Sequence, residues 1–279
     1  MAQNTTLNSE LFVPVLAAAQ FAAYENSVAR AIVNTYDLPM NAGKTVSIPV
    51  WDSVGAQIIT DESAAVKSTT DTNSKSITLT EHVVYHTVTD MLRDSASNNV
   101  LADLGEQSGR AIAESFDSQV FNLFNGFTTG LGTTKVALTV ESIMKAAAIL
   151  RSRKLTGPFY AVVRPEQAFD IKVQLANAGG STIPSLSDEG NRVLNQYFIG
   201  SISGVTILES ALLNVDAEDD AVGAVFAPSA IGHAMRGTVV MEEQRQAAAR
   251  ATDLVLTGVA GADIIRLERG IKLLGKSAL

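Results

Sequence analysis

The segment 45–80 begins and ends like a β-strand and is polar in its middle. Apolar residues alternate with polar ones near its two ends, at Val46, Ile48, Val50, Ile77 and Leu79. This period of two predicts a two-stranded excursion with one apolar face. Between residues 60 and 76 the only apolar side chains are Ala64, Ala65 and Val66. Such arms bury no core of their own, so we expect them to pack against something else.

Two helical patterns flank this excursion. Residues 11–36 read as a helix with Pro14 in the first turn, and Asp37-Leu38-Pro39 ends it. After the excursion the chain stays extended through residues 81–90. A second helix then runs from near Asn98 to just before Gly126, with apolar residues at steps of three and four. Its length is about 42 Å, and its single apolar stripe predicts a helix lying on a surface.

From about residue 136 short helices and strands alternate. The pattern predicts a helix capped by Thr139 and ending by Gly157, a buried strand FYAVV, and a helix opened by Pro165. A surface loop is expected at 176–191, followed by strands VTILES and AVGAVFA. A helix PSAIGHAMR and a strand pair around Gly258 and Gly261 complete the chain. The fold class is α+β, without a repeat.

Composition limits the function classes. The 279 residues are 46% hydrophobic and 18% charged, enough for two compact units. A net charge of −8 provides no broad basic surface for nucleic acid. The cluster Arg151, Arg153 and Lys154 is expected to complement a helix C-terminus. The chain has no cysteine, no signal peptide and no apolar run near the roughly 20 residues that a bilayer requires. We therefore expect a soluble protein made in the cytoplasm.

No catalytic, cofactor-binding or metal-binding residue can be assigned. His82 and His86 would lie about 13 Å apart on a strand, too far to share a metal, and His233 is expected to be structural. Ser142 and Lys145 form an S-x-x-K pattern without the companion motifs of serine acyl-enzymes. The stretch GFTTGLGTTK lacks the ending of a phosphate loop, and GSISG is typical of a tight turn between strands. The acidic runs AEDD and Glu242-Glu243 are expected to be solvated.

The order of elements resembles the major capsid protein of tailed bacteriophages, with its Hong Kong 97-like fold. TVSIPVWDSVGAQIITDESAAV resembles the extended loop of that family, and VLADLGEQSGRAIAESFDSQVFNLFNG resembles its spine helix. FYAVVRPEQAFDI resembles the start of the axial domain, and GSISGVTILES with AVFAPSAIGHAMRG resembles its later part. The resemblance covers nearly the whole chain and rests on the order of these segments, because each is weakly specific alone.

The resemblance implies a division into four parts. These are an N-terminal arm at 1–43, an extended loop with its base strands at 44–92, a peripheral domain at 93–135 and 238–279, and an axial domain at 136–237. It also implies a shell protein of the virion that assembles in the host cytoplasm as pentamers and hexamers and expands as DNA enters. The shell would enclose DNA without sequence-specific binding and without a membrane. Separate scaffolding, portal, decoration or cement proteins are expected partners.

The extended loop carries the strongest expectation. Each arm has about 12 residues, so its tip would lie roughly 40 Å from its base and would reach a neighbouring subunit. Some members of the family crosslink a lysine to an asparagine. Lys67 and Lys75 lie in the loop, but no partner asparagine stands out, so we predict no crosslink.

Three alternatives remain at this point. An encapsulin-like nanocompartment shell shares the fold but holds a cargo enzyme. A soluble α+β enzyme or ligand-binding protein would form a small oligomer with a defined pocket. A capsid decoration or tail-tube protein is a further alternative, although such proteins seldom need so long a helix.

Overall fold

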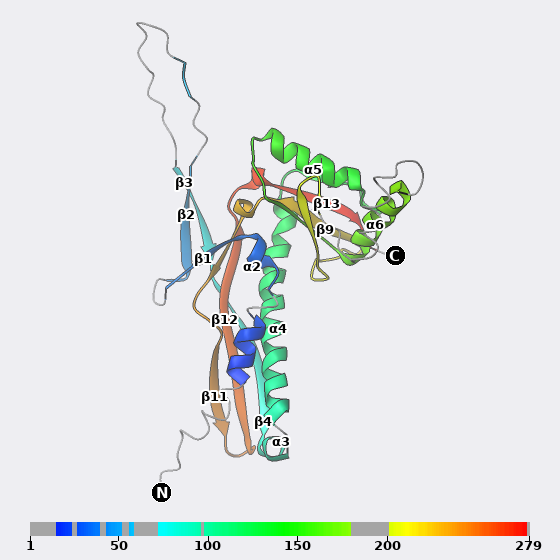
Figure 1. Cartoon of the computed structure of the whole chain (residues 1–279). Coiled ribbons are helices and arrows are strands. Elements are labelled where there is room, and N and C mark those ends of the chain that lie inside the picture. Colours follow the sequence, from blue (N-terminus) through cyan, green and yellow to red (C-terminus); the bar gives the residue numbers. More distant parts are fainter. Residues whose placement is uncertain are drawn as a thin grey trace.

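The computed structural model describes residues 15–23, 27–39, 43–51, 56–58, 72–95, 98–179 and 201–277. It contains a five-stranded sheet, a six-stranded sheet and a two-stranded hairpin. The long helix α4 (Asn98–Asn122) runs beside the five-stranded sheet and reaches the six-stranded one (Figure 1). The 3-10 turn η1 (Leu123–Gly126) ends it, as the sequence predicts. At 1.5 Å per residue, these 25 residues span about 37 Å.

The five-stranded sheet is built around β12 (Ala251–Ile264). One edge of β12 pairs along its length with β4 (Thr80–Thr89). The other edge pairs first with β11 (Val240–Gln246) and then with β10 (Ile231–Met235), all antiparallel. The short β1 (Asn34–Asp37) adds in parallel to β10. A 14-residue strand joined to three others thus forms the long axis of this unit.

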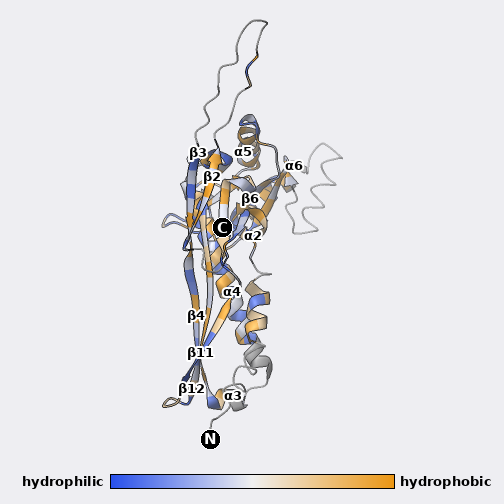
Figure 2. Ribbon diagram, turned by 90° about the vertical axis from the view of Figure 1, so that its left-hand side faces the viewer, coloured by the Kyte–Doolittle hydropathy of each residue, from blue (hydrophilic) through white to orange (hydrophobic). Residues whose placement is uncertain are grey.

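Helix α4 covers one face of this sheet. Its Ile112 and Phe116 pack against Leu256 and Ala260 of β12. Gly258 lies between those two residues of β12, and a Cβ there would be 2.7 Å from the Phe116 ring. The glycine therefore permits the close approach of helix and sheet. Figure 2 shows α4 and the strands β4, β11 and β12 side by side along the length of the molecule.

The hairpin consists of β2 (Thr45–Trp51) and β3 (Thr72–Thr78), which pair antiparallel over seven residues. Its base packs on the face of the five-stranded sheet opposite to α4. Ile48 and Ile77 are buried there against Ala234 and Ile265. A short helix, α3 (Asp90–Ser95), follows β4 at the opposite end of the molecule (Figure 1).

The six-stranded sheet is mixed, with the order β5-β13-β9-β6-β8-β7. Its strands are β5 (Gly130–Gly132), β6 (Phe159–Val163), β7 (Ser201–Ile202), β8 (Val205–Glu209), β9 (Asp220–Phe226) and β13 (Gly270–Lys276). The parallel pairs are β5 with β13 and β6 with β8, and the other pairs are antiparallel.

Helices cover both faces of this second sheet. Helices α5 (Val140–Ser152) and α6 (Pro165–Gly179) pack on one face through a core that includes Ile143, Leu150 and Ile171. The end of α4 packs on the other face, together with α2 (Ala29–Ile32). All five residues of β6, FYAVV, are buried or half-buried. An apolar strand of this kind needs cover on both faces of its sheet, and the helices provide it. Thr139 accepts a hydrogen bond from the Ser142 backbone N–H and caps α5, as predicted.

Three predictions about local structure are wrong. Residues 34–37 form β1 and not the end of the first helix, because they pair with β10. Residues 231–235 form β10, after a single 3-10 turn η2 (Pro228–Ala230), and not a helix. Gly258 and Gly261 lie inside one continuous strand, β12, and not at a turn between two strands. A second 3-10 turn, η3 (Leu267–Arg269), separates β12 from β13.

Strand pairing also crosses the expected domain limits, as β10 and β13 illustrate. β10 belongs to the sheet of β12, although the sequence grouped it with the axial segment 136–237. β13 belongs to the sheet of β6 and β9, although the sequence grouped it with the peripheral segment 238–279. The predicted loop at 176–191 lies largely outside the described residues; residues 176–179 are the last turn of α6. Within the described part of the chain, no helix is long and apolar enough to cross a membrane.

Candidate assembly surfaces

The hairpin β2–β3 has one face buried at its base and one face open to solvent. Along β2 only the alternate residues Val46, Ile48 and Val50 are buried or half-buried. Along β3 only Ile77 is buried, and the other six residues are exposed. Trp51, the single tryptophan of the chain, is 57% exposed at the outer end of β2. Within the described part of the chain, the outer end of the hairpin therefore carries an aromatic side chain that is more than half exposed.

A helix in the N-terminal arm packs against α4 backbone to backbone. The helical residues 15–23 place Val15 and Ala19 directly on Gly105 and Gly109. A Cβ on Gly109 would lie 2.3 Å from the Ala19 carbonyl oxygen, and a Cβ on Gly105 would lie 2.4 Å from that of Val15. Gln20 adds a 2.8 Å hydrogen bond to the Val239 carbonyl. Two glycines one helical turn apart thus allow the arm to seat on the spine of the subunit.

Asp117 of α4 fastens the next part of the arm. Its carboxylate accepts hydrogen bonds from the Ser27 hydroxyl at 2.7 Å and from the backbone N–H groups of Val28 and Ala29 at 2.8 and 3.2 Å. The residue is 2% exposed. Burial raises the pKa of Asp117, and the three hydrogen bonds oppose that rise. The arm is therefore held at two points along α4.

Two histidines of β4 connect that strand to α4. His82 Nδ1 lies 2.6 Å from the Ser115 hydroxyl, and His86 Nε2 lies 3.0 Å from the Ser108 hydroxyl. Ser108 donates its own proton to the Leu104 carbonyl, so His86 must be the donor in its pair. As predicted, the two rings lie on one face of an extended strand. Each binds a separate serine.

His233 of β10 is buried in the same interface. It is 2% exposed, its ring lies 6.1 Å from that of Phe116, and its Nδ1 has no hydrogen-bond partner among the described residues. Burial lowers the pKa of His233 to about 4, with further lowering from the nearby charges of Arg30 and His82. Burial also lowers the pKa of His82, and a hydrogen bond with Gln119, which favours the protonated ring, opposes this change. The contact of α4 with the sheet thus contains neutral rings.

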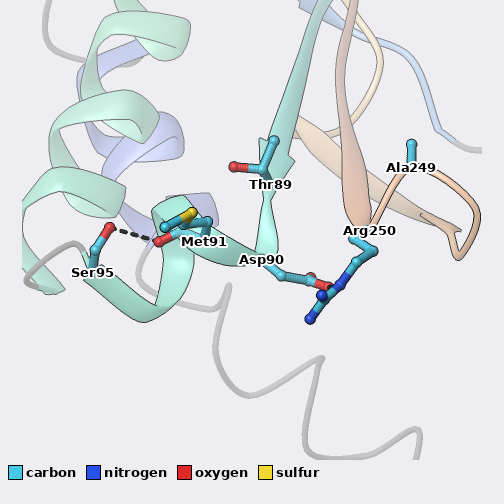
Figure 3. Close-up of a pocket in the computed structure, with 6 residues that line it drawn as sticks. All are labelled: Thr89, Asp90, Met91, Ser95, Ala249 and Arg250. Atoms are coloured by element: carbon cyan, nitrogen blue, oxygen red, sulfur yellow. Dashed lines mark hydrogen bonds and ion pairs between the residues drawn. The ribbon is translucent and has the colours of Figure 1, made fainter.

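The end of the molecule remote from the six-stranded sheet has an open hollow of about 720 Å³ (Figure 3). Asp90 lies beside it and forms two hydrogen bonds with Arg245, of 2.6 and 2.7 Å. Arg250 contacts the same carboxylate at 3.9 Å. Met91 is 83% exposed at this hollow. The charges here fix the β11–β12 turn to α3 and leave an apolar side chain accessible.

The sequence patterns examined for chemistry have structural roles. Lys145 pairs with Glu141 on the outer face of α5, and Ser142 lies in the cap of that helix. Within GSISG, Ser203 and Gly204 form the turn between β7 and β8, as predicted, and Gly200 lies outside the described residues. Among the described residues, no three His, Asp or Glu side chains are close enough to hold a metal ion. Lys67 lies outside the described residues, and Lys75 is exposed on β3.

The contact between the arm and α4 was not predicted from the sequence. The signal was GEQSG within the predicted helix, since a glycine in a helix interior costs about 1 kcal/mol relative to alanine and needs a packing reason. The cleft described below was also missed, because residues far apart in the sequence form it.

The sheets, spine helix, arm and hairpin define the Hong Kong 97-like class of shell proteins. Solved structures with this fold include those from Mycobacterium phage Che8 (TM-score 0.64, 19% identity, 83% of this chain and 84% of that chain). Another is the capsid of a native GTA particle (TM-score 0.71, 12% identity, 90% and 91%). A virus-like particle from Pyrococcus furiosus also shares the fold (TM-score 0.58, 13% identity, 93% and 98%).

The family is shown by sequence. Residues 69–272 match the phage capsid protein family, which is most of the chain. The chain therefore belongs to the phage capsid protein family and is a major capsid protein, a structural protein and not an enzyme. Among curated proteins no match was found. The encapsulin alternative is not favoured, because the sequence match is to phage capsids.

Proposed function

We propose that copies of this chain assemble as pentamers and hexamers into a shell that encloses double-stranded DNA of a tailed phage. The observation that carries this proposal is the hairpin β2–β3, which has a buried base and an uncovered outer end. Ile48 and Ile77 anchor it, while Trp51 is exposed beyond the anchor. An exposed tryptophan is typical of the centre of a protein interface. A neighbouring subunit is its partner in this proposal.

The arrangement supports a division of labour within the subunit. The unit around the six-stranded sheet would surround the capsomere axis, and the unit around β12 would join neighbouring capsomeres. By strand pairing, β10 would count with the second unit and β13 with the first. The net charge of −8 suits a shell that releases its DNA. Separate scaffolding, portal and cement proteins, assembly in the host cytoplasm, and expansion during DNA entry are part of the same proposal.

Shortening the hairpin tests this function. Residues 56–70 would be replaced by an Asn-Gly link, which leaves the pairing of β2 with β3 intact. The subunit should fold with an unchanged unfolding midpoint, because Ile48 and Ile77 stay in place. Shells should be absent from electron micrographs, whereas the full-length chain forms them. Normal yields of shells from the shortened chain would contradict the proposed role of the hairpin.

Two finer points have their own tests. No Lys–Asn crosslink is expected, so denaturing gels of particles should show a single subunit band, and a covalent ladder would contradict this. Expansion predicts that particles are larger after DNA packaging than before it. Equal diameters by electron microscopy would contradict the expansion.

A further inference from the structure

A cleft of about 530 Å³ lies between the outer half of the hairpin, the end of α5 and the connection from β12 to β13. Four cationic side chains line it: Lys75, Arg153, Arg266 and Arg269. They come from β3, from the end of α5 and from the connection between β12 and β13. Glu268 is the single acidic residue among the described lining residues. These lining residues therefore carry a net charge of +3 on a chain whose net charge is −8.

The described residues leave most of the positive charge of this cleft without an ion-pair partner. Among the described residues, none of the four cations forms an ion pair; Arg153 donates to the Glu268 backbone carbonyl and to Thr129, and Arg269 donates to Ser229. Burial lowers the pKa of Arg269, and the nearby charge of Arg266 lowers it further. Glu268 opposes this lowering, but one carboxylate does not balance four cations. Like charges held together cost free energy, so a further anionic partner is favoured here.

The cleft also has an apolar side. Trp51 and Leu267 line it and are 57% and 40% exposed. A phosphate backbone would use the cations but would leave these two side chains uncovered. A protein segment with both an apolar residue and carboxylates would use both features.

A segment with these features lies at the end of the six-stranded sheet opposite to the cleft. The loop before β9 exposes Asp216, Glu218 and Asp219 next to Val215, which is 38% exposed. The loop is ordered by its own hydrogen bonds, since Asp216 accepts from the backbone N–H groups of Glu218 and Asp220. Glu218 makes one exposed ion pair, with Lys135 at 3.4 Å. Exposed pairs of this kind contribute little, so Glu218 can exchange its partner.

Strand register places the loop and the cleft far apart. Asp220 is opposite Lys276, and Phe226 is opposite Gly270, which directly follows Arg269. Six residues of strand separate these two ends, or about 20 Å. The loop of one subunit therefore does not fill its own cleft. Two different, complementary surfaces on opposite ends of one unit are what a closed head-to-tail ring requires.

We propose that the cleft formed by Lys75, Arg153, Arg266 and Arg269 binds the acidic loop Val215–Asp219 of the next copy of this chain around the capsomere. This rests on the proposed function, since it needs neighbouring subunits. The contact sets the order of subunits in the ring through charge, and Trp51 and Leu267 cover Val215 at its centre.

Charge reversal on each side tests the contact. The cleft variant is Lys75→Glu with Arg266→Glu, since neither side chain forms a hydrogen bond with another described residue. The loop variant is Glu218→Lys with Asp219→Asn, because asparagine tolerates the positive φ of 61° at that position. The control is Lys75→Arg with Arg266→Lys, which keeps the charge. Circular dichroism of unassembled subunits verifies that every variant folds.

Assembly is followed by light scattering against subunit concentration, in about 0.05 M and about 1 M NaCl. At low salt each reversal should raise the concentration for half-assembly by about tenfold or more, and the two reversals together should restore assembly to within about threefold. At high salt the single reversals should differ from the natural chain by less than about threefold, because charges are screened beyond about 3 Å. The control should assemble like the natural chain.

The outcomes separate this contact from the proposed function. If the two reversal variants form shells as efficiently as the natural chain does, the proposed contact is overturned and the proposed function stands. Unchanged assembly of the cleft variant with loss of binding to a short DNA duplex would also overturn it and would assign the cleft to nucleic acid. Failure of the natural chain to form any shell would instead overturn the proposed function.

Discussion

Gly109→Leu is expected to detach the N-terminal helix from α4. Leucine is the better helix former by about 1 kcal/mol, so an exposed site would be stabilised by this change. Here, however, the new Cβ would lie 2.3 Å from the Ala19 carbonyl oxygen, and no rotamer of the side chain relieves a contact of its Cβ. The helical residues 15–23 must therefore move away from α4.

The cost follows from what the helix buries. Val15 and Ala19 are 0% exposed, and Ala22 is 2% exposed. Burial of a valine contributes about 1.5–3 kcal/mol, and each buried methyl group about 0.8 kcal/mol. The total is about 4 kcal/mol, and the gain in helix propensity leaves a net loss of about 3 kcal/mol. The balance therefore favours detachment.

Hydrogen exchange of unassembled subunits measures this loss locally. Amides of residues 15–23 should exchange about a hundredfold faster in the variant, while amides of β12 should be unchanged. Gln107→Leu is the matched control, because Gln107 is exposed on the same helix. Unchanged exchange in the Gly109 variant, or a gain of about 1 kcal/mol in stability, would refute the close packing of the arm on α4.

Three further predictions concern polar side chains that hold elements of the fold together. Burial lowers the pKa of His233 from 6.5 in the unfolded chain to about 4 in the folded one, so the free energy of unfolding should fall by about 3 kcal/mol as the pH decreases from about 6.5 to 4. In His233→Leu the denaturant midpoint should depend less on pH than in the natural chain. An equal dependence in the two proteins would contradict the burial of a neutral ring. Asp90→Ala should cost about 1–2 kcal/mol by urea unfolding, because it breaks the two-bonded pair with Arg245, whereas Glu106→Ala on the exposed face of α4 should cost under about 0.5 kcal/mol. Gln167→Leu should lower stability by about 2–4 kcal/mol in the same assay, since the buried amide donates to two backbone carbonyls that would lose their partner; a loss below about 0.5 kcal/mol would show that those carbonyls find another donor.

The elements that the sequence predicted well have strong local signals. Helix α4 has a long apolar stripe, α5 has Thr139 as its cap, and β6 is a short apolar run between turn residues. These features depend on neighbours within a few residues, so periodicity and capping rules describe them. The hairpin β2–β3 was predicted for the same reason.

The errors arise where distant pairing decides the structure. Ile231 and Met235 are four residues apart after a proline, as in a helix, but β12 pairs with this segment over residues 260–264. The strand β1 exists because it adds to β10, about 200 residues later. The partner of the hairpin base was also not apparent, since Ala234 and Ile265 come from the last part of the chain. Tertiary contacts of this kind override local propensity.

The central claim is that this chain builds a closed shell. Purified protein should be examined by sedimentation and electron microscopy at concentrations where the subunit is abundant. We expect uniform megadalton particles with icosahedral symmetry, containing rings of five and six subunits. A sharp monomer or dimer under every condition of salt and concentration would contradict the claim.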